Sequence, residues 1–67
     1  MITLGTKAKN LMTNDTVAIA DNGKWWIGGI VAMHVNDISV NVLLTSKDRG
    51  DRKVWFYSNE VVNKVVD

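Results

Sequence analysis

The Asn22-Gly23 pair constrains the fold of this chain more than any other feature, because it separates two runs that are rich in apolar residues. Asn-Gly supplies the positive φ angles that a tight two-residue hairpin requires, so the flanking runs are predicted to be antiparallel strands. The first predicted strand covers residues 16–20 and the second covers residues 25–35. Within the second, Gly28-Gly29 predicts a bulge or a sharp bend, since glycine has no side chain to pack in a sheet.

The rest of the chain continues this alternation of apolar runs and turns. It predicts a two-residue turn at 36–37, a strand at 38–45, a charged loop at 46–53, a strand at 54–57, a single 3₁₀ turn at 58–60 and a strand at 61–66. The sequence therefore predicts an all-β domain, a small five-stranded barrel over residues 14–67. The N-terminal segment, residues 1–13, is predicted to hold a short turn or helix at 6–13, capped by Thr6.

Composition limits what else can stabilise such a domain. The chain has 67 residues and no cysteine, so it can form neither a disulfide nor a thiolate metal site, and His34 alone cannot bind a metal. A domain this small has a thin stability margin, which favours self-association. The formal charge of +1 creates no broad field for nucleic acid. Since no signal peptide is visible and no apolar stretch approaches ~20 residues, we expect a cytoplasmic protein with no cofactor, metal or membrane partner.

The order of the predicted elements resembles that of SH3-like small β-barrels over residues 14–66. In local detail the chain is similar to the plasmid-borne type II dihydrofolate reductases. Those proteins carry a Gly-Asp-x-Val start, a Ser-Gly turn, a Trp-x-Gly-x-Ile-Val strand and a Val-Gln-Ile-Tyr strand. The matching segments here are 14–17 (Asn-Asp-Thr-Val), 22–23 (Asn-Gly), 26–31 (Trp-Ile-Gly-Gly-Ile-Val) and 54–57 (Val-Trp-Phe-Tyr).

This resemblance implies a barrel and a tendency to oligomerise, but not the reductase activity. Trp55 and Phe56 stand where that family has its active-site Gln and Ile, so only Tyr57 carries over. Residues 7–11 and the segment Asn-Gly-Lys-Trp resemble, more weakly, the N-terminal barrel of elongation factor P. The lysine-tipped Pro-Gly loop of that family is replaced here by Asn36-Asp37.

Strand register divides the predicted sheet into two faces. With the turn at 36–37, Val35 pairs with Ile38, and Leu44 is placed opposite Val54. Alternation then directs one set of side chains into the core: Val31, Met33, Val35, Ile38, Val40, Val42, Leu44, Val54 and Phe56. The opposite set points outward: Ile30, Ala32, His34, Ser39, Asn41, Leu43, Trp55 and Tyr57. A one-residue error in register would exchange the two faces.

The outward set contains the predicted partner-binding residues Ile30, His34, Asn41, Leu43, Trp55 and Tyr57. An exposed apolar patch marks a contact site, and Trp and Tyr are favoured interface anchors. The alternative is that barrel curvature covers Trp55 or Trp26 with the N-terminal segment. Alternation also places one of Trp25 and Trp26 in the core and the other outside, without deciding which.

These patterns favour a non-enzymatic module that docks a partner protein or another copy of itself, such as a phage or mobile-element adaptor or inhibitor. No catalytic residues are predicted, because no Ser-His-Asp set can be assembled around one histidine and the carboxylates fall in turns. An enzyme assembled only in an oligomer is a further alternative. A third reading is a nucleic-acid-binding barrel in which Trp55 and Tyr57 stack on bases while phosphates are bound by Lys24, Lys47, Arg49, Arg52 and Lys53.

Overall fold

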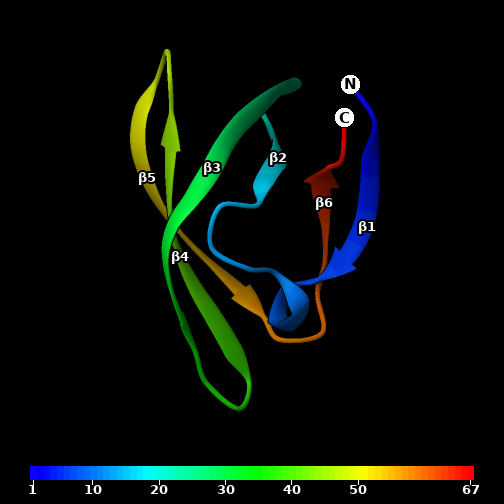
Figure 1. Cartoon of the computed structure of the whole chain (residues 1–67), viewed down its shortest axis with the longest axis vertical. Coiled ribbons are helices and arrows are strands. Elements are labelled where there is room, and N and C mark those ends of the chain that lie inside the picture. The colour runs from blue at the N-terminus through cyan, green and yellow to red at the C-terminus, as the bar shows by residue number, and fades with distance from the viewer.

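The computed structural model describes all 67 residues and contains a single antiparallel sheet with no α-helix (Figure 1). Its elements are β1 (Thr3–Lys7), the 3₁₀ turn η1 (Ala8–Asn10), β2 (Thr16–Asp21), β3 (Lys24–Val35), β4 (Ser39–Ser46), β5 (Gly50–Tyr57) and β6 (Val61–Val65). The strand order is β1-β6-β2-β3-β4-β5, so β1 and β5 are the two edges and the sheet is not closed. The all-β class is confirmed, with six strands rather than five.

The β2–β3 hairpin forms as the sequence predicts. Asn22 and Gly23 both have positive φ angles, of 50° and 77°, and Asp21 pairs with Lys24 across the turn. β3 then continues for twelve residues and pairs with β2 along its first half and with β4 along its second half. In Figure 1 this long, bent strand links the β1-β6-β2 side of the molecule to the β4-β5 side.

A bulge in β3 reverses which residues face the core. The register with β4 shifts between Ile30 and Ala32, which leaves Val31 as the extra residue. Before the bulge Trp26 and Ile30 point inward and are 4% and 1% exposed, whereas after it Met33 is the inward residue. The predictions that Ile30 points outward and Val31 inward were therefore wrong, because an extra residue changes the alternation. Trp26 is the buried tryptophan and Trp25 the exposed one.

The two following hairpins are each shifted by two residues from their predicted register. Val35 pairs with Val40 across a longer loop, in which the Asn36 N–H donates to the Ser39 carbonyl at 2.8 Å, and Val42 pairs with Val54. A shift of two preserves the faces, so Val40, Val42, Leu44 and Phe56 are buried as predicted.

Two other residues predicted to be in the core, Val35 and Ile38, are exposed. Both lie at the β3–β4 hairpin tip, which extends beyond the rest of the molecule at the bottom of Figure 1. β5 begins at Gly50, so the predicted charged loop at 46–53 is reduced to residues 47–49.

The N-terminal segment contributes a strand that the sequence did not predict. β1 pairs with β6, and η1 follows within the predicted window. The Ala8 N–H donates to the Glu60 carbonyl and the Lys9 N–H to the Ser58 carbonyl, each at 2.9 Å, which attaches η1 to the β5–β6 turn. Ala8 and Leu11 are buried beneath this attachment. They complete a core that also contains Val17, Trp26, Ile30, Val40, Val42, Leu44, Phe56 and Val62.

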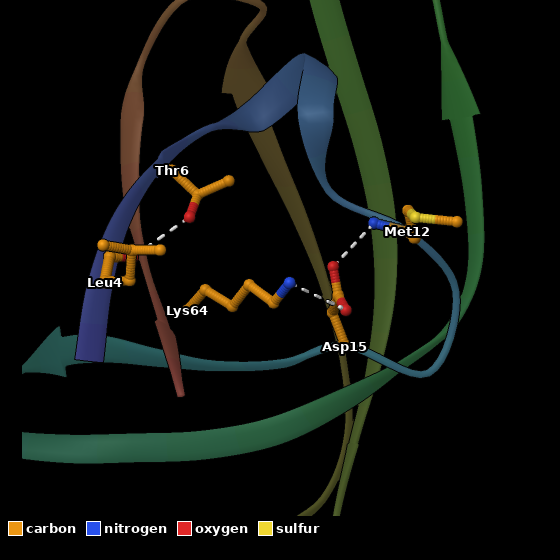
Figure 2. A network of polar contacts seen from close by, with 5 residues as sticks. All are labelled: Leu4, Thr6, Met12, Asp15 and Lys64. Carbon is orange, nitrogen blue, oxygen red and sulfur yellow. Dashed lines mark hydrogen bonds and ion pairs between the residues drawn. The ribbon is translucent and has the colours of Figure 1, made fainter. Parts of the chain in front are cut away.

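Asp15 fastens the loop that leads from η1 into β2 (Figure 2). Its carboxylate accepts a hydrogen bond from the Met12 N–H at 2.8 Å and forms an ion pair with Lys64 on β6 at 3.5 Å. The Asp15 N–H donates in return to the Met12 carbonyl at 3.1 Å. One side chain therefore closes the turn and ties it to the neighbouring strand, which holds β2 in register with β6.

We predict that Gly28→Ala lowers the free energy of unfolding by about 2 kcal/mol, the usual cost of overpacking a core. A Cβ at Gly28 would lie 2.5 Å from the Trp26 ring and 3.0 Å from the Thr45 carbonyl oxygen. At the adjacent Gly29 the nearest atom to a new Cβ is the Asp15 carbonyl oxygen at 4.0 Å, so Gly29→Ala is the matched control. It should leave stability unchanged or raise it by up to about 1 kcal/mol. Urea unfolding of both variants tests this, and equal losses would contradict the account of the bend.

Candidate functional site

The outer face of the β3-β4-β5 hairpins carries most of the predicted contact residues. Strand register places Ala32, Leu43 and Lys53 in one row and His34, Asn41 and Trp55 in the next. Residues directly opposite one another on adjacent strands share a face, so each row crosses the sheet. Tyr57 extends this surface along β5. We call it the aromatic face and define it by Ala32, His34, Asn41, Leu43, Lys53, Trp55 and Tyr57.

Trp55 and Tyr57 are the most prominent side chains of the aromatic face. They lie two residues apart on β5 and are 48% and 62% exposed. Their rings meet edge to face with centroids 4.4 Å apart and an interplanar angle of 73°, the geometry that aromatic pairs prefer. Phe56 between them points the other way and is buried in the core. β5 therefore packs Phe56 into the core and exposes the contacting rings of Trp55 and Tyr57 on its other face.

A shallow groove of about 440 Å³ lies against these residues. It is lined by Ala32, His34, Asn41, Leu43, Lys53 and Trp55 of the aromatic face, together with Met33, Val42 and Val54 from the intervening positions. Most of the lining is apolar, and the polar groups of His34, Asn41 and Lys53 are distributed among the apolar residues. This arrangement suits an extended or flat partner that covers the Trp55 ring.

The structure brings together five of the six predicted partner-binding residues. His34, Asn41, Trp55 and Tyr57 are exposed and Leu43 is half-buried. Ile30 is excluded because the bulge at Val31 turns it into the core. Ser39, which was also expected to point outward, is buried beside Asn36 in the β3–β4 loop, where the Asn36 Nδ2 donates to its Oγ at 3.4 Å.

Lys53 is the member of the site that sequence reasoning placed elsewhere. The sequence predicts Lys53 in a charged loop and, in the alternative hypothesis, in a nucleic-acid interface, whereas it lies on β5 opposite Leu43. Its position two residues before Trp55 was the available signal, because residues i and i+2 of a strand share a face.

The basic residues of the nucleic-acid reading do not form one surface. Lys24 lies at the β2–β3 turn, Lys47 and Arg49 lie at the β4–β5 turn, and only Lys53 belongs to the aromatic face. Asp48 and Asp51 are interspersed among them, which lowers the local positive charge.

Arg52 points to the inner side of β5 and is already engaged. Its Nη1 lies 3.2 Å from the Asp21 carboxylate on β2, where it donates a hydrogen bond, and its guanidinium lies 5.6 Å from the centroid of the Trp26 ring. Arg52 therefore links β5 to the β2–β3 hairpin across the open side of the sheet.

Elsewhere the structure presents little concentrated chemistry. No group of three or more His, Asp or Glu side chains is arranged to hold a metal ion, and every buried side-chain nitrogen and oxygen has a hydrogen-bond partner. A second hollow of about 510 Å³ lies over the glycine bend of β3 and is lined mainly by polar residues, including Thr16, Thr45 and Lys47. No helix of this chain is both long and apolar enough to cross a membrane.

We predict that Arg52→Ala lowers the free energy of unfolding by about 1 kcal/mol, because it removes a partly exposed ion pair and a cation over an aromatic ring. Arg49→Ala is the matched control, since Arg49 is exposed at a turn and its side chain forms no hydrogen bond or ion pair. It should change stability by less than about 0.5 kcal/mol. Thermal or urea unfolding distinguishes the two variants. An unchanged free energy of unfolding for Arg52→Ala would contradict the stabilising role of the contacts with Asp21 and Trp26.

Comparison with protein-family models, with curated proteins and with solved structures found no match for this chain.

Proposed function

We propose that this protein is a non-enzymatic binding module that docks a partner protein, or a second copy of itself, through the aromatic face. The observation that carries the proposal is the Trp55–Tyr57 pair, two large rings held against each other in solvent. Large aromatic residues bury 150–250 Å² each when covered, so an exposed, ordered pair is a strong source of binding energy. Trp and Tyr are also the residues most enriched at interface hot spots.

The surroundings of the two rings support docking rather than simple exposure. Leu43 and Ala32 supply apolar area beside Trp55, while His34, Asn41 and Lys53 supply donors and acceptors around it. Interfaces commonly combine an apolar centre with a polar rim in this way. No pronounced single-sign charge accompanies the face, which fits recognition by shape and burial.

The backbone beneath the aromatic face favours binding without rearrangement. β4 is paired along its length with β3 on one side and β5 on the other. Phe56, Val40 and Val42 fix these strands from within the core. Because the rings need little ordering when a partner arrives, less binding energy is lost to conformational entropy.

We also propose that β2 to β6 form a unit of the SH3-like kind, to which β1 adds a sixth strand. The observed order of the elements supports this: a hairpin with an Asn-Gly turn, a long bent strand, two further strands and a turn before the last strand. The last strand, β6, lies beside the first of the five, β2, as in small barrels, although β5 and β6 are not paired with each other. β1 then covers the other edge of β6.

Nucleic-acid binding has less support than protein docking. It would need several cations near the stacking rings, and the aromatic face offers only Lys53. Arg52 is turned inward and paired with Asp21. Steep salt-dependent binding of an oligonucleotide, lost on Arg49→Ala but not on Trp55→Ala, would favour that reading over ours.

We predict that Trp55→Ala weakens association by roughly 30-fold, the effect of losing a hot-spot residue of about 2 kcal/mol. Trp25→Ala is the matched control, because Trp25 is 49% exposed, nearly the same as Trp55, but lies at the β2–β3 turn. Sedimentation measures self-association and affinity capture measures a heterologous partner, with circular dichroism to verify folding. Retention of both kinds of binding by a folded Trp55→Ala protein would exclude the aromatic face as the docking surface.

A further inference from the structure

The outer edge of β5 carries backbone groups that bond to nothing in this chain. The Ser58 N–H donates to the Ile38 carbonyl at 2.9 Å, which shows that even-numbered residues at this end of β5 direct their backbone toward β4. The Tyr57 N–H points the other way, to the Glu60 carboxylate at 3.2 Å. Successive residues in a strand alternate in this respect, so the N–H and C=O groups of Asp51, Lys53 and Trp55 lie on the free edge. None of these three residues makes a backbone bond outside the regular strands.

We propose that this edge pairs, antiparallel, with the same edge of a second copy of the chain, with the two-fold axis at Val54. The inference rests on the proposed function and extends it, since the pairing places the Trp55 rings of both copies on one continuous outer surface. A two-fold contact uses the same residues twice, so the edge must be complementary to itself.

Charge and hydrogen bonding together select this register. An axis at Lys53 sets two ammonium groups opposite each other. An axis at Arg52 pairs Lys53 with Asp51 of the second copy, but it also sets two guanidinium groups opposite each other on the inner side, where each already binds Asp21. An axis at Trp55 requires the Tyr57 backbone, which is already bonded to Glu60 at both its N–H and its carbonyl.

An axis at Val54 avoids all three conflicts. It pairs Lys53 with Trp55 of the second copy, and Trp55 with Lys53 of the second copy. This satisfies the free N–H and C=O groups of Lys53 and Trp55 in each chain and leaves those of Asp51 to solvent. Each Lys53 stem then lies along an indole with its ammonium near the ring, an attractive arrangement for a cation and an aromatic side chain. On the inner side Val54 meets Val54.

The charged residues of β5 take on a specific role in this arrangement. Lysine on an edge strand, and a charge that points inward such as Arg52, usually protect an edge from indiscriminate pairing. In this dimer Lys53 and Arg52 discriminate among registers. Like charges disfavour the registers centred on Lys53 and Arg52, whereas the register centred on Val54 places Lys53 opposite Trp55. The surface so formed is small, so we expect a dimer that dissociates on dilution.

A cysteine at the axis tests the register directly, because the natural chain contains no cysteine. Val54 faces Val54 as a non-hydrogen-bonded pair, for which the Cα atoms are ~4.5 Å apart, within the range of a disulfide. We expect Val54→Cys to form a covalent dimer under mild oxidation. Val61→Cys, on the exposed side of β6, is the control and should stay largely monomeric at the same concentration. Equal cross-linking of both variants, or none at position 54, would overturn the proposal.

A proline on the free edge separates this inference from the proposed function. Lys53→Pro removes an N–H that does not bond to β4, so the fold should survive while dimerisation falls more than tenfold in sedimentation experiments. Lys53→Ala keeps the N–H and should weaken the dimer only a few-fold. Equal effects of proline and alanine would refute edge pairing. A dimer or complex that survives Lys53→Pro but is lost on Trp55→Ala would retain docking by the aromatic face and reject the edge, whereas insensitivity to both variants would reject both proposals.

Discussion

The packing of Trp26 against Gly28 is the contact on which the rest of the structure depends. The indole occupies the space where a side chain at position 28 would lie, and this allows β3 to bend around its own tryptophan. The bend carries the β2–β3 hairpin toward β5, where Arg52 lies over the ring and binds Asp21. A sheet of six strands thereby encloses a core without pairing its two edges. In a chain with no cysteine, this packing takes the place of a covalent staple.

The same geometry determines what remains outside. The bulge at Val31 turns Ile30 into the core and directs Ala32 and His34 onto the surface beside Leu43 and Asn41. β5 completes this surface because alternate residues of the strand point to opposite faces. Phe56 and Arg52 point inward, whereas Lys53, Trp55 and Tyr57 face solvent. Since the sheet does not close, β5 carries both the aromatic residues Trp55 and Tyr57 and an unpaired backbone edge.

Local sequence predicted the turn and the alternation well, because both depend on few neighbouring residues. Asn22-Gly23 formed its turn, and the faces of residues 40–44 on β4 and 54–57 on β5 were placed correctly even though each register was shifted by two. The position of the bulge was not predictable, because Gly28-Gly29 signals an irregularity whereas the extra residue is Val31. β1 lacks an alternating apolar pattern, and it forms a strand because it pairs with the edge of β6. Residues 50–53 resembled a loop, since charges are frequent in loops but are also tolerated on an edge strand.

Amide hydrogen exchange of β5, measured by NMR at low and at high protein concentration, tests the central claim that this strand has a free edge available for docking. In dilute solution the amides of Arg52, Val54 and Phe56 should be protected by β4, while those of Lys53 and Trp55 exchange rapidly. At high concentration the Lys53 and Trp55 amides should become protected as the edges pair. Uniform protection along β5 in dilute solution, or rapid exchange at Lys53 and Trp55 that does not change with concentration, would contradict the account.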